Sequence, residues 1–189
     1  MSSHHVVREK QEPALLVLGL DNFDEELLGQ LLEWSPTVIT TVQTAEKLHS
    51  LGVKIDWIIT DSITHAEQSD VKIMGANGNS PGNAALEYLT GYEYPSVNIV
   101  TDELNLEDYL PFADRINLVI FNNNKRIFPI PPGFKKWKPA GEAITILSAA
   151  TGVQSAGLNK VDEEHYETSH DGIFSLRFNE PFIFIAESL

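Results

Sequence analysis

Residues 38–63 read VITTVQTAEKLHSLGVKIDWIITDSI, and this stretch decides the fold class of the chain. Residues 37–41 predict a strand, residues 44–51 a short helix closed by Gly52, and residues 57–60 a second strand. A strand, a helix and a strand in succession are the unit from which parallel sheets with helical cover are built. The stretch therefore has the frame of an active-site unit, but it carries almost none of the carboxylates that metal-assisted chemistry needs.

The same alternation precedes and follows this stretch. Residues 14–20 form a continuous apolar run, which is typical of a strand buried on both faces. Asn22 and Glu25 have the spacing of a capping box and predict the start of a helix, and Pro36 ends that helix. Further elements are predicted down the chain: a strand at 71–74, a helix that begins at Ser80 and Pro81 and includes 84–88, a strand at 97–101, a short helix capped by Asn105, and a strand at 116–121.

After residue 122 the pattern changes to short strands separated by Pro, Gly and Asn. Strands are predicted at 126–130, 143–149, 173–178 and 182–186. We therefore predict an α/β fold. Residues 1–122 form an N-terminal Rossmann-like parallel sheet with helices, and residues 123–189 form a small C-terminal all-β, sandwich-like domain. Four aromatic residues of the second part are expected in its core: Phe174, Phe178, Phe182 and Phe184.

Composition excludes several classes of protein. The 189 residues include no Cys, which excludes disulfides, thiol nucleophiles and Cys-ligated zinc. The six His show no tight ligand spacing such as H-E-x-x-H. No apolar run approaches the roughly 18 residues of a membrane span, and the polar residues 1–10 lack the apolar core of a signal peptide. A cytoplasmic protein without a membrane partner is expected.

Charge is distributed unevenly. Residues 1–113 hold five Lys or Arg against eighteen Asp or Glu, a net charge of −13, and the remainder has a net charge of −1. An acidic surface repels nucleic acid and anionic lipid, so neither is an expected partner. Lys135, Lys136 and Lys138 form a basic group around Trp137, which we interpret as a solvated turn rather than a polyanion site.

The order of these elements resembles the thiamin pyrophosphokinase family. The resemblance rests on residues 51–59 (LGVKIDWII) and 61–63 (DSI), on residues 155–158 (SAGL), and on Ser169 with His170. It extends through nearly the whole chain. It implies an α/β domain and a β-sandwich domain that form a homodimer and, with Mg²⁺, transfer a pyrophosphoryl group from ATP to thiamin.

The chain departs from the acidic motifs of that family. Residues 42–45 (VQTA) stand where the family has Asp-Gly-Gly-Ala, and Thr60-Asp61-Ser62 is two residues shorter than Gly-Asp-x-Asp-Ser. Residues 76–81 (ANGNSP) replace Asp-x-Asp-x-Thr-Asp. Near residues 104–109 only Asp108 can correspond to the aspartate of Gly-Gly-Arg-x-Asp-His. Mg²⁺ is held by carboxylates together with substrate phosphates, so these losses bear directly on the chemistry.

Six residues remain as candidates, each with a structural alternative. Asp61 and Asp108 are the catalytic candidates, Asp61 is the candidate metal ligand, and the ligand-binding candidates are Ser62, Asp102, Ser169 and His170. An Asp at the end of a strand often caps a turn or helix, and an acid in a first helical turn often offsets the helix dipole. A Ser-His pair without a placed acid is no triad, and a turn explains it equally well. Asp21 and Asp24 follow the first strand, where capping is the simpler role.

The sequence therefore indicates two main alternative functions. The preferred one is a non-catalytic or catalytically impaired relative of thiamin pyrophosphokinase that keeps a dimeric two-domain scaffold and a pocket for a small molecule. The alternative is an active enzyme with relocated Mg²⁺ ligands. A pocket that accepts another small molecule is a third possibility, since a fold does not fix a function.

Overall fold

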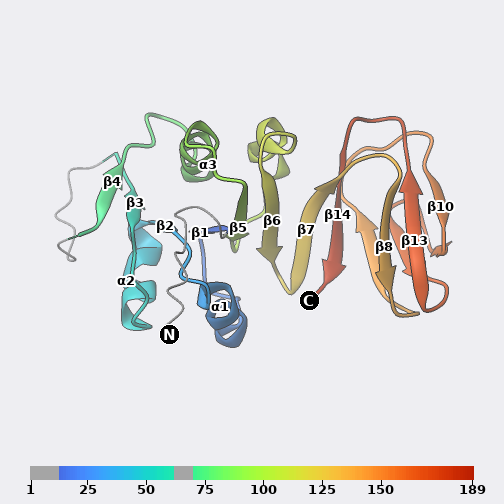
Figure 1. The fold of residues 1–189 in the computed structure, drawn as a ribbon, viewed down its shortest axis with the longest axis horizontal. Helices are drawn as coiled ribbons and strands as arrows, with labels where there is room; N and C mark the ends of the chain where they lie inside the picture. Colours follow the sequence, from blue (N-terminus) through green and yellow to red (C-terminus); the bar gives the residue numbers. More distant parts are fainter. Residues whose placement is uncertain (1–12, 62–69) are drawn as a thin grey trace, which may run out of the picture. The chain divides into compact units, whose positions relative to one another are not determined.

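The computed structural model describes residues 13–61 and 70–189, and the chain divides into two compact units, Met1–Leu118 and Val119–Leu189 (Figure 1). In the described part of the chain, no helix is long and apolar enough to cross a membrane. The assignment of residues 1–122 and 123–189 as functional domains stays a prediction.

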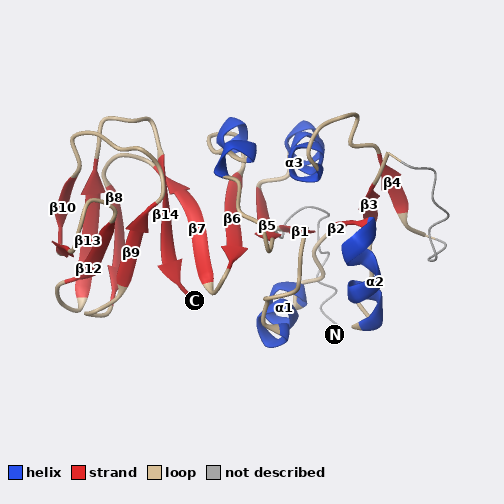
Figure 2. Cartoon of the chain, turned by 180° about the vertical axis from the view of Figure 1, so that it is seen from behind, coloured by secondary structure: helices blue, strands red, loops and turns tan. Residues whose placement is uncertain are grey.

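The first unit contains a parallel sheet with strand order β5-β1-β2-β3-β4. Figures 1 and 2 show α1 and α2 on one side of this sheet and α3 on the other. The element bounds are β1 (Ala14–Val17), α1 (Glu25–Leu32), β2 (Val38–Thr41), α2 (Val42–Ser50), β3 (Trp57–Ile59), β4 (Lys72–Met74), α3 (Pro81–Gly91), β5 (Ser96–Val100) and the 3₁₀ turns η1 (Leu106–Asp108) and η2 (Leu110–Phe112).

The central strand β1 is buried along its whole length, as its continuous apolar run predicts. Helices cover both faces of the sheet, so neither set of alternating side chains reaches water. The α/β class with a parallel sheet is confirmed.

The helix starts follow from their capping residues. Ser80 accepts the Asn83 amide and Pro81 occupies the first turn of α3, as predicted. The predicted cap of α1 at Asn22 is wrong, because Asp24 accepts the Leu27 amide at 2.9 Å and places the first turn two residues later. Asn105 occupies the N-cap position of η1, as predicted, but its side chain makes no capping hydrogen bond.

The second unit is built from antiparallel strands in two sheets. The orders are β11-β12-β9-β14-β7-β6 and β10-β13-β8. The strands are β6 (Asn117–Asn122), β7 (Lys125–Ile130), β8 (Phe134–Lys138), β9 (Ala143–Ile146), β10 (Gln154–Ala156), β11 (Leu158–Lys160), β12 (His165–Thr168), β13 (Gly172–Arg177) and β14 (Ile183–Ser188). The antiparallel C-terminal part of the predicted fold is confirmed.

Side chains from both sheets form one core in this unit. Phe174 and Leu176 of β13 pack with Ile183 and Ile185 of β14. Phe178 belongs to the same cluster, and Phe184 is also fully buried. The prediction that aromatic residues form the core of this part is confirmed for these three.

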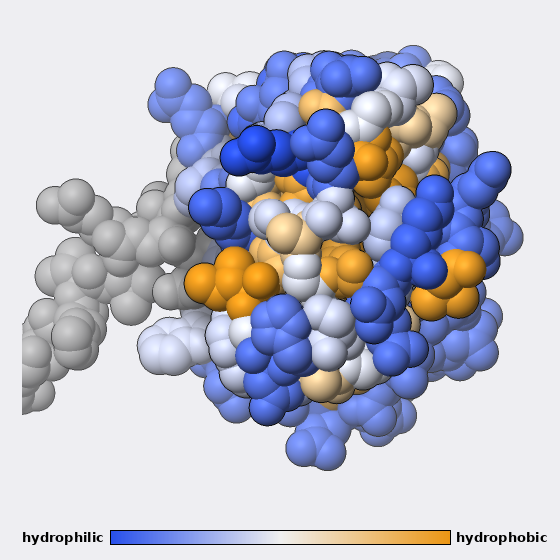
Figure 3. All heavy atoms as spheres, turned by 90° about the vertical axis from the view of Figure 1, so that its right-hand side faces the viewer, coloured by the Kyte–Doolittle hydropathy of each residue, from blue (hydrophilic) through white to orange (hydrophobic). Residues whose placement is uncertain are grey.

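The basic group at residues 135–138 was expected to be a solvated turn, and this is wrong. These residues belong to β8, which pairs with β13. Lys136 and Lys138 lie within 3.4 Å of the buried Glu187 carboxylate, whereas Trp137 is 60% exposed beside Ile173, its cross-strand neighbour. Figure 3 shows the end of the molecule at the right-hand side of Figure 1, where hydrophobic surface lies among hydrophilic side chains.

Candidate functional site

The candidate site lies at the carboxyl edge of the parallel sheet. β2, β3 and β4 are added in turn on one side of β1, whereas β5 pairs in parallel with β1 on its other side, so the order in which strands are added reverses between β1 and β5. In open α/β sheets, ligands bind in the crevice outside the carboxyl ends of the strands at such a reversal. The loops after β1 and β5 therefore form the candidate site.

Asp102 joins these two loops. It follows β5, and its carboxylate accepts the backbone amide of Asp21 at 2.9 Å and that of Asn22 at 3.1 Å. Both carboxylate oxygens thus bind the loop after β1, about 80 residues away in the sequence. The structure brings Asp102 to the predicted edge and shows it bonded to the protein's own backbone.

Gly19 makes this contact possible, and sequence reasoning did not select it. A Cβ added at Gly19 would lie 2.2 Å from Asp102 Oδ2 and 2.9 Å from its backbone nitrogen. Any side chain here would displace the Asp102 carboxylate. The available signal was a single glycine inside an otherwise apolar run at the end of a strand, which often marks close approach of another backbone.

Two side chains of α2 hold the same loop from the other side. Thr44 Oγ1 donates to the Leu18 carbonyl at 3.2 Å, and Lys47 Nζ donates to the Leu20 carbonyl at 2.6 Å. Lys47 also lies 3.4 Å from Asp21 Oδ1. The loop after β1 is therefore fixed by polar contacts from both of its neighbours, and neither Thr44 nor Lys47 was a sequence candidate.

Asp61 joins the next pair of loops. Its Oδ1 accepts the Asn77 amide at 2.9 Å, which links the carboxyl end of β3 to the loop after β4. Asn77 has a left-handed backbone, with φ of 53°, and its side chain donates to the Gly75 carbonyl at 3.3 Å. Ser62, the predicted ligand-binding neighbour of Asp61, lies outside the described residues.

Asp61 and Asp102 are too far apart to hold one metal ion directly. β1 and β2 separate β3 from β5, so the two strands are roughly 14 Å apart at about 4.8 Å per neighbour. Ligands of one Mg²⁺ lie about 2.1 Å from it. Among residues 13–61 and 70–189, no group of three or more His, Asp or Glu could hold a metal ion. The donor set therefore does not fit a Mg²⁺ shared by these carboxylates.

Asp108 lies at the end of η1, next to a buried tyrosine. Burial raises the pKa of Tyr109 to about 12, and the negative charge of Asp108 adds to this increase. The Tyr109 ring approaches the first turn of α3, with Cε1 3.8 Å from a Cβ built at Gly82. Asp108 therefore adjoins a phenol that stays neutral at physiological pH. Its predicted catalytic role stays a prediction.

Ser169 and His170 lie together in the second unit, in the turn between β12 and β13. Ser169 Oγ and His170 Nδ1 are 2.8 Å apart, and both side chains are exposed. The neighbouring Asp171 carboxylate accepts the Ala140 amide at 2.8 Å, and the Ser169 amide donates to the Gly157 carbonyl at 3.0 Å. These bonds stabilise a turn. The predicted ligand-binding role of the pair stays a prediction.

The fold defines a class of protein with a parallel α/β unit followed by an antiparallel β unit. Within that class, the chain has the fold of the thiamin pyrophosphokinases. The enzyme of Bacillus subtilis superposes with a TM-score of 0.70 at 14% identity, covering 93% of this chain and 99% of that one. Yeast thiamin pyrophosphokinase superposes with a TM-score of 0.66 at 13% identity, covering 97% of this chain and 88% of that one. The thiamin pyrophosphokinase of Candida albicans superposes with a TM-score of 0.66 at 10% identity, covering 94% of this chain and 90% of that one.

No family model and no curated protein matches the chain at the level of sequence. The predicted resemblance is therefore confirmed as a resemblance of fold that spans nearly the whole chain.

Proposed function

We propose that this chain is a thiamin pyrophosphokinase-like protein that binds a small molecule, such as thiamin or ATP, without transferring a pyrophosphoryl group. In this proposal the first unit is Rossmann-like, the second is sandwich-like, and the protein is a cytoplasmic homodimer. One observation carries the proposal: the carboxylates of Asp102 and Asp61 are acceptors for backbone amides of neighbouring loops.

These contacts oppose the electrostatics of phosphate transfer. Backbone amides at the carboxyl edge of a sheet are suited to phosphate oxygens, because they present partial positive charge. Asp102 binds two such amides and adds a negative charge of its own. Hydrogen bonds to a charged group contribute about 1.5–3 kcal/mol each, and less at an exposed position, so freeing these amides has a cost.

The replacement of the family's acidic motifs also favours a loss of catalysis. Removing one preorganised electrostatic contact typically lowers a rate by about a hundred- to a thousandfold. The motifs that would supply such contacts are replaced at residues 42–45 and 76–81. A chain that lacks several of them retains little catalysis.

The test is a Mg²⁺-dependent reaction of the full-length protein with ATP and thiamin, analysed for AMP and thiamin diphosphate. We expect neither product. We expect ATP or thiamin alone to raise the melting temperature, because a ligand at about 100 times its dissociation constant stabilises a protein by about 2.7 kcal/mol. Formation of AMP and thiamin diphosphate in equal amounts would overturn the proposal.

The second candidate is an active thiamin pyrophosphokinase with relocated Mg²⁺ ligands. It is favoured by the position of Asp61 and Asp102, which both follow strands at the carboxyl edge of the sheet. If products form, Asp61→Asn tests this candidate, since loss of a metal ligand should lower the rate by about two orders of magnitude or more. A rate unchanged by this substitution would exclude Asp61 as a ligand.

A further inference from the structure

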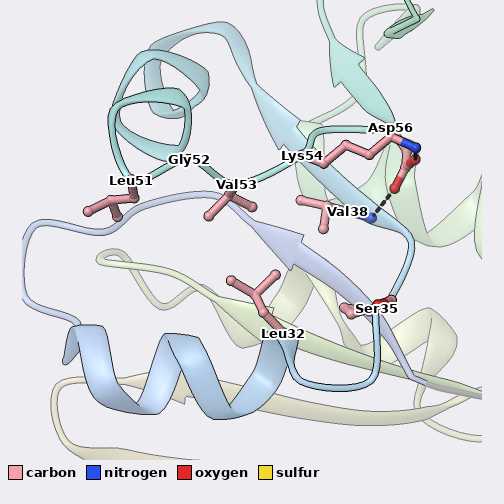
Figure 4. A pocket seen from close by; sticks show the side chains of 9 residues that line it. Leu32, Ser35, Val38, Leu51, Gly52, Val53, Lys54 and Asp56 are labelled. Carbon is pink, nitrogen blue, oxygen red and sulfur yellow. Dashed lines mark hydrogen bonds and ion pairs between the residues drawn. The ribbon is translucent and has the colours of Figure 1, made fainter.

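A hollow of about 420 Å³ lies at the opposite edge of the same sheet, where β2 and β3 begin and α1 and α2 end (Figure 4). Its volume falls in the range of small-molecule sites, roughly 300–1,000 Å³. The lining comes from the end of α1, from the turn that leads into the first residue of β2, and from the loop between α2 and β3: Leu32, Ser35, Pro36, Val38, Leu51, Gly52, Val53, Lys54 and Asp56. No function was assigned to this edge by the sequence.

The walls of the hollow are apolar and polar in nearly equal parts. Figure 4 shows Leu32 of α1 and Val53, which follows α2, directed toward each other across the opening. Val38 is buried at the start of β2, and Leu51 is 40% exposed at the rim. An apolar ligand placed between these side chains would remove both its own surface and theirs from water.

One carboxylate is fixed at the edge of the hollow. Asp56 Oδ2 accepts the Val38 amide at 2.9 Å, which holds the side chain in place. Asp56 Oδ1 lies 3.7 Å from Lys54 Nζ, and the Lys54 side chain is 80% exposed. An ion pair of that length and exposure is weak, so another ammonium group can replace that of Lys54.

The surroundings of Asp56 also favour a cation. α1 and α2 both end at this edge, at Leu32 and Ser50, and the carboxyl end of a helix carries partial negative charge. The first 113 residues add a net charge of −13. An anionic ligand would be repelled by the carboxyl ends of α1 and α2 and by the net negative charge of this part of the chain.

We propose that this hollow is a second ligand site that binds a small organic cation. The ammonium group of the ligand pairs with Asp56, and its apolar body lies against Leu32, Leu51 and Val53. The site is separate from the crevice at the carboxyl edge, so it neither requires nor excludes the function proposed above.

The experiment titrates the full-length, isotope-labelled protein with 2-phenylethylamine and follows backbone amide and methyl resonances. Shifts are expected at the Val38 amide and at the methyl groups of Leu32 and Val53. The amides of Asn22 and Asn77, at the opposite edge, serve as internal references. Shifts confined to Asn22 and Asn77 would overturn the proposal, as would the absence of saturable shifts at Val38.

Charge recognition is tested with 2-phenylethanol and three variants. 2-Phenylethanol, which has no charge, should bind about two- to fivefold more weakly than the amine. The Asp56→Asn variant should weaken amine binding by a similar factor, because the ion pair is lost while the carboxamide oxygen still accepts the Val38 amide.

Lys54→Ala should tighten amine binding by a similar factor, since it removes the competing ammonium group. Glu87→Gln, on exposed surface of α3, changes the net charge equally and should leave binding unchanged. Equal affinity for alcohol and amine, or equal responses of Asp56→Asn and Glu87→Gln, would refute the ion pair.

Discussion

Glu187 offers the sharpest test of what stabilises the second unit. Its side chain is fully buried, and its Oε2 lies 2.6 Å from Lys136 Nζ, 2.9 Å from Arg126 Nη2 and 3.4 Å from Lys138 Nζ. Oε1 is buried without a hydrogen-bond partner among the described residues. The substitution Glu187→Gln keeps the size of the side chain and removes its charge, so three cations lose the carboxylate that they share.

The magnitude follows from how far each cation reaches water. Removing one partner of a fully buried ion pair costs about 3–5 kcal/mol. The side chains of Arg126 and Lys136 are 40% and 28% exposed and regain hydration, whereas that of Lys138 is 13% exposed and keeps, among the described residues, the Glu142 carboxylate at 3.4 Å. We therefore expect a loss near the lower limit, about 3 kcal/mol. For a chain of this length that lowers the melting temperature by roughly 6–12 °C.

The assay is urea unfolding followed by circular dichroism, with Glu142→Gln as the matched control. Glu142 contacts the same Lys138 but has a side chain 35% exposed, so its neutralisation should cost less than about 1 kcal/mol. Equal losses for the two variants would refute the claim that burial makes Glu187 important. A fully stable Glu187→Gln variant would refute the claim that the three cations depend on its charge.

The same carboxylate predicts a pH dependence. Burial by itself would raise the pKa of Glu187, but hydrogen bonds from Lys136 and Arg126 and the charges of Lys136 and Lys138 outweigh it and lower the pKa below its ordinary value. A lowered folded-state pKa adds stability above the unfolded pKa, near 4.3, and this stability is lost as the pH falls through the folded value. Unfolding measured between pH 6 and pH 3 should therefore show a steeper acid loss for the wild type than for Glu187→Gln. Parallel curves would contradict the lowered pKa.

Three further substitutions test local geometry by urea unfolding. Gly19→Ala should cost about 1.5–3 kcal/mol, because its Cβ displaces the Asp102 carboxylate from the amides it binds; an unchanged stability would mean that this contact contributes nothing. Ser80→Ala removes the cap of α3 and should cost about 1 kcal/mol, and a loss below about 0.3 kcal/mol would argue against the cap. Gly157→Ala should cost about 2 kcal/mol or more, since φ is 74° and the new Cβ would lie 2.9 Å from a backbone carbonyl oxygen. Gly29→Ala, on an open face of α1, is the control and should be neutral or stabilising.

The strands of the first unit could be predicted because local pattern and tertiary environment agree there. β1 is apolar and also buried on both faces, so its sequence alone marks it. β8 could not be predicted in this way. Lys136 and Lys138 occupy inward positions where an apolar residue is expected, and they are tolerated because the buried Glu187 carboxylate, about 50 residues away in the sequence, lies within 3.4 Å of both ammonium groups. Alternation predicts a strand only where the buried positions are apolar.

For the candidate site, the sequence predicts where the carboxylates lie but not what they contact. A carboxylate at the end of a parallel strand can be placed from sequence, and Asp61 and Asp102 do lie at the carboxyl edge. Whether such a carboxylate faces a ligand or a backbone amide cannot be predicted, because every non-proline residue of an approaching loop carries the same amide. For Asp102 the distinction depends on Gly19, since the carboxylate reaches Asp21 and Asn22 only where position 19 has no side chain. The two positions are therefore coupled: a side chain at position 19 would displace the Asp102 carboxylate and also the backbone nitrogen of residue 102, which lies 2.9 Å from a Cβ built there, so the loop amides of Asp21 and Asn22 would lose this acceptor.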